Sequence, residues 1–167
     1  REAVSYAVNR EELRDTAYLG INKIASGPFA PGVMGYLEDT GMPDFDLEHA
    51  TELATEYEES TGELFRFTAP ILNSTESLGV AQFVQAQLKE AGITMDIRPV
   101  EQAAEIETAL GDDWEMLMWR NQPGGDPDTQ YVWWHSGIPS NFNKLDDPEV
   151  DRLLDEGRTT TDHAARP

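Results

Sequence analysis

The stretch VAQFVQAQLKEAGITMDIRPVE (residues 80–101) decides the fold class of this chain. Its first half has apolar residues at helical spacing and closes on Gly92, a residue typical of helix ends. Its second half alternates apolar and polar residues from Ile93 to Ile97, which is the pattern of a strand buried on one face. The stretch therefore predicts a helix that is followed at once by a β-strand.

The flanking sequence extends this pattern in both directions. Before it, residues 64–71 carry apolar and aromatic side chains and predict a strand. After it, residues 103–110 predict a short helix, and WEMLMW (114–119) predicts a third, buried strand. Strands that alternate with helices at this spacing favour right-handed crossovers and a parallel sheet. We therefore expect an α/β fold with a parallel-rich sheet flanked by helices, in a single lobe that spans residues 1–167.

The helix starts outside this region carry capping residues. Residues 3–19 predict two short helices that meet at Asn9, which forms a capping box with Glu12. Asp46 is the expected cap of a further helix. Two later starts combine an aspartate cap with a proline in the first helical position: Asp126 with Pro127, and Asp147 with Pro148.

Between the first helices and Asp46, the chain is rich in glycine and proline. The segment 20–46 contains GPFAPG (27–32) and further glycines, so we expect a long irregular loop. Loops of this length inside a domain are usually functional or lie over a neighbouring part of the protein.

The composition excludes several classes of function. The 167 residues include 32 Asp and Glu against 12 Lys and Arg, and the resulting net charge of −20 repels nucleic acid. The absence of cysteine excludes disulfides and cysteine-ligated zinc. A hydrophobic content of 39% is enough for a core, but no apolar stretch approaches the roughly 20 residues that span a bilayer.

The acidic residues are unevenly distributed. No Lys or Arg occurs between Lys23 and Arg66, a segment that we interpret as a solvated acidic face with helix caps; a rim that attracts cations is the alternative. Lysine is also scarce along the whole chain, which fits either a GC-rich genome or adaptation to salt, because salt screens the self-repulsion of an acidic protein.

Motifs of catalysis and cofactor binding are missing from the sequence. The three histidines lie far apart and none has the HxxxH or HExxH spacing of a metal-binding helix. There is no GxSxG, no GxGxxG and no phosphate-binding loop. We therefore predict no cofactor, no metal site and no catalytic residue.

The segment RNQPGGDPD (120–128) is the expected ligand site. In open parallel sheets, ligands bind outside the carboxyl ends of the strands, and this turn follows the predicted strand at 114–119. Trp119 and Phe142 are suited to lining a cleft, with polar groups beside them. Asp126 and Asp128 fit either helix capping or ligand contact. The candidate ligand-binding residues are Trp119, Arg120, Asn121, Gln122, Asp126, Asp128, Asn141 and Phe142.

Several stretches of this chain together resemble family 5 of the extracellular solute-binding proteins of ABC transporters, the oligopeptide, dipeptide and nickel-binding group. In chain order they are REAVSYAVNREEL (1–13), ASGPFAPGVMGY (25–36), VAQFVQAQLKEAGITMDIRPVE (80–101), WEMLMW followed by GGDPDTQ (114–130), HSGIPSNF (135–142) and DDPEVDRLLDEGRTTTD (146–162). Their order and spacing match the second lobe of a type II periplasmic binding protein.

The resemblance implies a transport function. Such proteins close two lobes over a solute, present the closed form to a membrane permease and perform no chemistry. The segment after the third strand contributes ligand contacts in this family, which carries over to residues 119–122 and to the turn from Gly124 to Asp128. Peptide binders of the family have an acidic residue four positions before the proline of this turn, where this chain has Pro123.

These features lead to the expectation of an exported receptor lobe, at the extracellular face of a membrane or in the periplasm. The expected partners are a peptide or other small polar solute and the permease, with membrane contact only through the permease or an anchor. Because the chain begins at Arg1 and ends within TTDHAARP (160–167), we expect a piece of a longer protein. The alternatives are a carbohydrate-active hydrolase that pairs Asp126 or Asp128 with Glu115, and an extracellular sensory domain.

Overall fold

The structure, a computed structural model, describes residues 1–111, 113–120, 124–162 and 164–166. It divides into two compact units. Unit 1 comprises Arg1–Ile24 and Gly41–Trp119, and unit 2 comprises Ala25–Thr40 and Arg120–Pro167. That the whole chain forms one lobe stays a prediction. Among the described residues, no helix is both long enough and apolar enough to cross a membrane.

A β-α-β motif forms the centre of unit 1 and confirms the predicted order of elements at residues 64–101. It consists of strand β1 (Arg66–Leu72), helix α4 (Thr75–Glu90) and strand β2 (Thr94–Val100). The two strands pair in parallel, from Arg66 opposite Thr94 to Leu72 opposite Val100. Gly92 lies between α4 and β2 with φ +82°, a conformation that side chains with a Cβ rarely adopt, so α4 ends here as predicted.

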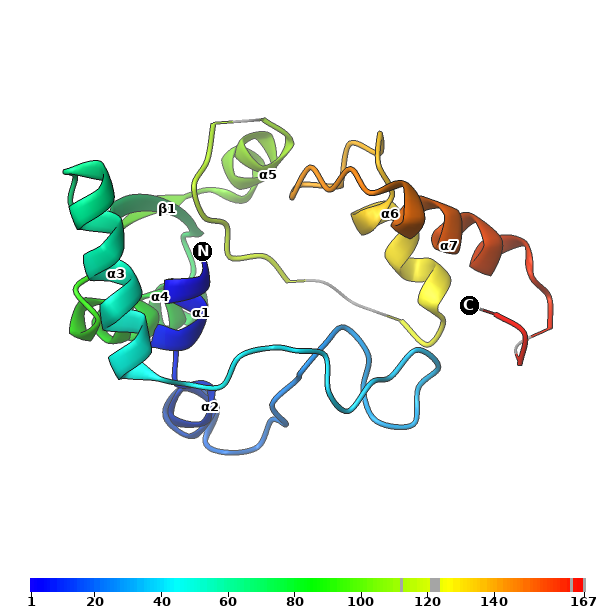
Figure 1. Ribbon diagram of the computed structural model, residues 1–167, viewed down its shortest axis with the longest axis horizontal. Coiled ribbons are helices and arrows are strands. Elements are labelled where there is room, and N and C mark those ends of the chain that lie inside the picture. The colour runs from blue at the N-terminus through cyan, green and yellow to red at the C-terminus, as the bar shows by residue number, and fades with distance from the viewer. Residues whose placement is uncertain (112, 121–123, 163, 167) are drawn as a thin grey trace. The chain divides into compact units, whose positions relative to one another are not determined.

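Four further helices of unit 1 surround this motif: α1 (Glu2–Ala7), α2 (Arg10–Tyr18), α3 (Leu47–Thr61) and α5 (Gln102–Leu110). The predicted caps are present, because the Asn9 side chain accepts from the backbone N–H of Glu12 and Asp46 accepts from that of His49, each at 3.0 Å. Helix α1 packs against α3 and α4, and Figure 1 shows these helices beside β1. The buried Gln87 of α4 accepts from the Asn9 backbone at 3.1 Å and so fixes the junction of α1 and α2.

The apolar core lies in unit 1. Its largest fully buried side chains come from the two strands, from α4 and from the connection between α4 and β2; they are Ile71, Leu88, Ile93 and Met95. Alanines at the contacts of α1, α3 and α4 let these helices approach closely: Ala3, Ala7, Ala50, Ala54 and Ala81. Burial of such side chains is the main favourable contribution to folding, at about 25 cal/mol per Å² of apolar surface.

The prediction of a third strand at residues 114–119 is wrong. The described sheet has only β1 and β2, and residues 113–120 are irregular. Met116 and Met118 do pack against the core, which explains the apolar pattern that suggested a strand. However, the backbone N–H of Thr68 in β1 donates to the Glu115 carboxylate at 2.9 Å. The Glu115 side chain thus binds the Thr68 amide at the edge of the sheet, which a third strand would have bound through its backbone.

Unit 2 has less regular structure. Residues 20–46, of which 25–40 belong to this unit, contain no helix or strand, as predicted. The remaining elements are a 3₁₀ helix η1 (Pro127–Gln130), α6 (Tyr131–Trp134) and α7 (Pro148–Thr159). The Asp126 and Asp147 caps are both present, each followed by proline in the first turn. In place of an apolar core, the buried side chains among the described residues of this unit are Gln130 and Asn141.

Candidate ligand-binding turn

The turn before η1 is held by local hydrogen bonds. Asp126 accepts from the backbone N–H of Asp128 at 2.9 Å through its side chain, and its carbonyl accepts from the Thr129 hydroxyl at 2.7 Å. Gly124 has φ +67°, and a Cβ there would lie 2.8 Å from the Thr129 methyl carbon. Only glycine therefore fits this position without displacement of Thr129.

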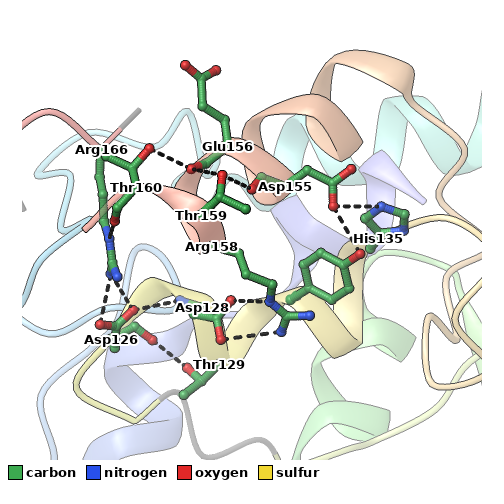
Figure 2. Close-up of polar contacts among 11 residues, drawn as sticks. Asp126, Asp128, Thr129, His135, Asp155, Glu156, Arg158, Thr159, Thr160 and Arg166 are labelled. Carbon is green, nitrogen blue, oxygen red and sulfur yellow. Dashed lines mark hydrogen bonds and ion pairs between the residues drawn. The ribbon is translucent and has the colours of Figure 1, made fainter. Parts of the chain in front are cut away.

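Asp126 is also bound by an arginine from the end of the chain. The Arg166 guanidinium donates from Nη1 to both carboxylate oxygens of Asp126 at 2.8 Å, and from Nε to the Thr160 carbonyl at 3.0 Å (Figure 2). The Arg166 side chain is 17% exposed. Because a partly buried charge is screened less by solvent than a surface charge, this pair restrains the turn more than an exposed pair would.

Asp128 is bound by a second arginine, from α7. Arg158 donates from Nε and Nη2 to the two Asp128 oxygens at 2.7 and 3.3 Å, as drawn in Figure 2. The hydrogen bond to Asp128 raises the pKa of Arg158 above its ordinary value. The guanidinium also lies 3.6 Å from the centroid of the Tyr131 ring, a cation–π contact. Both aspartates of the GGDPDTQ segment are thus engaged with arginines.

The Tyr131 ring also contacts His135. The two rings stack at 4.5 Å, and the Tyr131 hydroxyl donates to Asp155 of α7 at 3.1 Å. His135 lies between two carboxylates of α7, with Nε2 3.6 Å from Asp155 and Nδ1 3.8 Å from Asp151. Hydrogen bonds from Ser136 lower the pKa of Asp151. These contacts fasten α7 to η1 and α6.

A cavity of about 420 Å³ lies within unit 2 beside this network, a size typical of small-molecule pockets. Apolar side chains from residues 29–35 and from α7 form most of its lining, and both arginines reach it. The principal lining residues are Phe29, Met34, Val150, Leu153, Leu154, Arg158 and Arg166.

The structure places the sequence-predicted site residues in different surroundings. Trp119 is the last residue of unit 1 and is 37% exposed, whereas the exposed Arg120 begins the second segment of unit 2. Asn121 and Gln122 lie outside the described residues. Their roles as ligand contacts stay predictions.

Asn141 and Phe142 lie together in unit 2. The Asn141 amide is 2% exposed and donates to the carbonyls of His135 and Leu145, while its oxygen accepts from the Leu145 backbone. The half-buried Phe142 ring contacts Trp133 edge to face at 5.7 Å. These contacts stabilise the loop between α6 and α7.

Sequence reasoning missed Arg158 and Arg166. They lie 30 and 40 residues after their aspartate partners, so no local spacing connects them with the turn. Their occurrence near the end of an acidic chain was the only available signal, and it does not specify a partner.

The described residues offer little for metal or acid–base chemistry. No three His, Asp or Glu side chains gather in the described ranges as a metal site would require. The carboxylates of the hydrolase alternative have protein partners: Glu115 accepts from Thr68, and Asp126 and Asp128 bind arginines. The arrangement is suited to holding a turn in place.

Comparison with known proteins identifies the family. Residues 1–143 match the model of the bacterial extracellular solute-binding proteins, family 5. The chain belongs to this family. This family-5 chain has the fold of type II periplasmic binding proteins, as its solved structural neighbours show.

Among sequence relatives, the probable di/tripeptide-binding protein 5 of Pseudomonas aeruginosa is 30% identical over 99% of the chain and 32% of its own length. Among solved structures, the ABC transporter substrate-binding protein CtaP of Listeria monocytogenes has a TM-score of 0.84 and 28% identity, over 99% of this chain and 35% of its own. A nickel ABC transporter protein of Bacillus halodurans has a TM-score of 0.79 and 27% identity, over 99% and 37%. The chain therefore spans about a third of the length of these relatives.

Proposed function

We propose that the intact protein captures a peptide or another small polar solute in a cleft between two lobes and delivers it to the permease of an ABC importer. The observation that carries this proposal is the family-5 match, which covers residues 1–143 and thus includes the whole GGDPDTQ segment. Of the relatives named above, one is described as a probable di/tripeptide-binding protein and another as a nickel ABC transporter, so membership of the family does not fix the solute.

The proposed ligand contacts are concentrated before and within the turn. Trp119 offers an aromatic surface, and Arg120, Asn121 and Gln122 offer hydrogen-bonding groups. The exposed glycines at 124 and 125 allow a ligand to approach the backbone closely. Asp126, Asp128, Asn141 and Phe142 are proposed to support this surface.

The proposed protein is a receptor that performs no catalysis, and it acts at the extracellular face of the membrane or in the periplasm. The engaged carboxylates described above support the first statement, since a general acid or nucleophile needs a carboxylate that faces the substrate. The family match supports the second.

Native mass spectrometry of the full-length protein, purified without denaturation, tests this function. We expect a co-purifying series of di- and tripeptide masses. Trp119→Ala should lower the occupied fraction, whereas Leu64→Ala, which truncates an equally apolar and 73% exposed side chain, should not. A single non-peptide mass would support the receptor function but show that the solute is not a peptide. A protein that carries no solute and binds no added peptide would contradict the proposal.

A further inference from the structure

We propose that Arg158 and Arg166 are positioning residues for the ligand turn: they hold and neutralise its two aspartates, so that the turn does not select for a free ammonium group on the ligand. This inference rests on the proposed function and deepens it. It concerns what part of a solute the turn recognises.

The Asp126 side chain is 43% exposed, but its printed contacts occupy three of the roughly four acceptor sites of a carboxylate. Its Oδ1 accepts from the Asp128 backbone at 2.9 Å and from Arg166 at 2.8 Å, and its Oδ2 accepts from the same Arg166 nitrogen at 2.8 Å. A ligand ammonium would have to displace a guanidinium that is itself only 17% exposed. Displacing it would leave a partly buried cation without its partner, which is costly.

Asp128 is restrained in a comparable way. Its two oxygens accept from two nitrogens of Arg158, whose planar head is oriented by the Tyr131 ring 3.6 Å away. The Tyr131 hydroxyl is bound in turn to Asp155 of α7. Because α7 contributes both Arg158 and Asp155, the helix binds the turn through Asp128 and α6 through Tyr131.

The charges of the two ion pairs at the turn cancel. Two arginines face two aspartates of the turn, so it presents no uncompensated negative charge to a solute. The turn is therefore suited to uncharged ligand groups such as amide carbonyls and N–H groups. An ammonium group, where the solute has one, must find its counter-charge elsewhere.

Two peptides that differ only in the ammonium group test this selectivity in the full-length protein. The probes are trialanine and N-acetyl-trialanine, and the readout is the ratio of their dissociation constants by calorimetry. The double variant Asp126→Asn, Arg166→Gln, which removes the pair without changing the net charge, should leave the ratio within about twofold of wild type. Arg166→Gln should uncover the Asp126 charge and raise the preference for the free amine by about tenfold, or about 1.4 kcal/mol. Arg166→Lys should restore the wild-type ratio.

The matched control is Arg152→Gln. Arg152 lies on the same helix as Arg158 and pairs with Glu149 and Glu156 on an exposed face, so its loss changes the charge without touching the turn. The ratio of the two dissociation constants in Arg152→Gln should equal that of wild type. A tenfold loss of preference for the free amine in the double variant Asp126→Asn, Arg166→Gln would overturn the proposal, because Asp126 would then be the ammonium partner. Equal weakening of both peptides by Arg166→Gln would also overturn the selectivity.

A second readout needs no ligand. Amide hydrogen exchange at Asp128 and Thr129, whose N–H groups both bond to Asp126, should accelerate about tenfold in Arg158→Gln and in Arg166→Gln. Exchange in α4 should stay as in wild type. Arg158→Gln, which removes the more exposed arginine, serves where Arg166→Gln does not fold. Unchanged exchange in the turn would overturn the positioning role. If wild type binds neither peptide, the proposed function fails, and this measurement still decides the positioning role.

Discussion

The two units of this chain are stabilised by different interactions. Unit 1 buries apolar side chains from two parallel strands and the helices around them. In unit 2, the buried side chains among the described residues are the amides Gln130 and Asn141, and ion pairs and helix caps connect its short elements. Hydrophobic burial is insensitive to direction, whereas hydrogen bonds and ion pairs fix particular geometries. We therefore expect unit 1 to contribute most of the stability of the chain, whereas the polar contacts of unit 2 fix the geometry of the turn.

The largest expected difference between the units comes from a matched pair of leucines. Leu88 of α4 is fully buried, and Leu88→Ala should destabilise unit 1 by about 3 kcal/mol through lost burial and a residual cavity. Leu153 of α7 is 37% exposed, and Leu153→Ala should cost less than about 1 kcal/mol. Hydrogen exchange in α4 and in α7 measures the two effects separately. Equal losses of unfolding free energy in the two variants would contradict this difference between the units, because unit 2 would then depend on an apolar core.

A second prediction concerns the polar centre of unit 2. Asn141→Ala removes three hydrogen bonds and leaves the backbone groups of Leu145 without these partners, so we expect a loss of about 2 kcal/mol. Exchange of the Leu145 amide measures the loss. Asn143→Ala changes an exposed residue two positions away and serves as the control, with an expected effect below about 0.5 kcal/mol. A similar effect of both substitutions would contradict a structural role of Asn141.

The third prediction is a stabilising substitution in unit 1. Burial raises the pKa of Glu105 in α5, so the charged carboxylate is disfavoured in the folded state. Because a raised carboxyl pKa makes the folded protein bind protons more tightly, Glu105 lowers stability at neutral pH, and this penalty disappears as the pH falls below the unfolded-state pKa. Glu105→Gln should raise the unfolding free energy at pH 7 by less than about 1 kcal/mol and have no benefit at pH 3.

The exposed Glu107 on the same helix provides the control for this substitution. Urea denaturation of Glu107→Gln at both pH values should show no comparable change between them. A destabilised Glu105→Gln at pH 7 would show that the carboxylate is needed there, and the hydrogen bond from the Leu72 backbone would be the reason.

The smallest expected effects are those of salt, and they have opposite signs in the two units. Helix α3 carries five glutamates in a segment without Lys or Arg, so screening by 0.5 M salt should relieve repulsion and slow amide exchange there. The same salt should weaken the Arg158–Asp128 pair and accelerate exchange at Thr129. Each effect should be about 0.5 kcal/mol. Changes of the same sign would show that one electrostatic response governs the whole chain.

Much of the fold could be predicted because it depends on local patterns. The β-α-β motif follows from periodicity at residues 64–101, and the caps at Asn9, Asp46, Asp126 and Asp147 follow from residue type and position. The irregular structure of residues 114–119 could not be predicted. The apolar pattern of this segment indicates which side chains are buried, but it does not indicate which backbone groups form hydrogen bonds. The Glu115 side chain occupies the Thr68 amide, and sequence spacing does not reveal this.

The candidate site shows the same limit. The turn was located from composition and its place after an apolar segment, and the Asp126 cap was among the roles expected. The arginines that bind its aspartates could not be found, because ion pairs across 30 and 40 residues have no signature in a single sequence. Asn141, expected at the ligand, has its amide engaged with backbone groups of its own loop.

Hydrogen exchange of the full-length protein with and without a saturating dipeptide tests the central claim most directly, which is that the segment around the turn receives the solute. We expect the dipeptide to slow exchange at residues 119–130 while α3 remains unchanged, because a bound solute excludes water from the backbone that it contacts. Binding that leaves exchange at residues 119–130 unaltered would contradict the account.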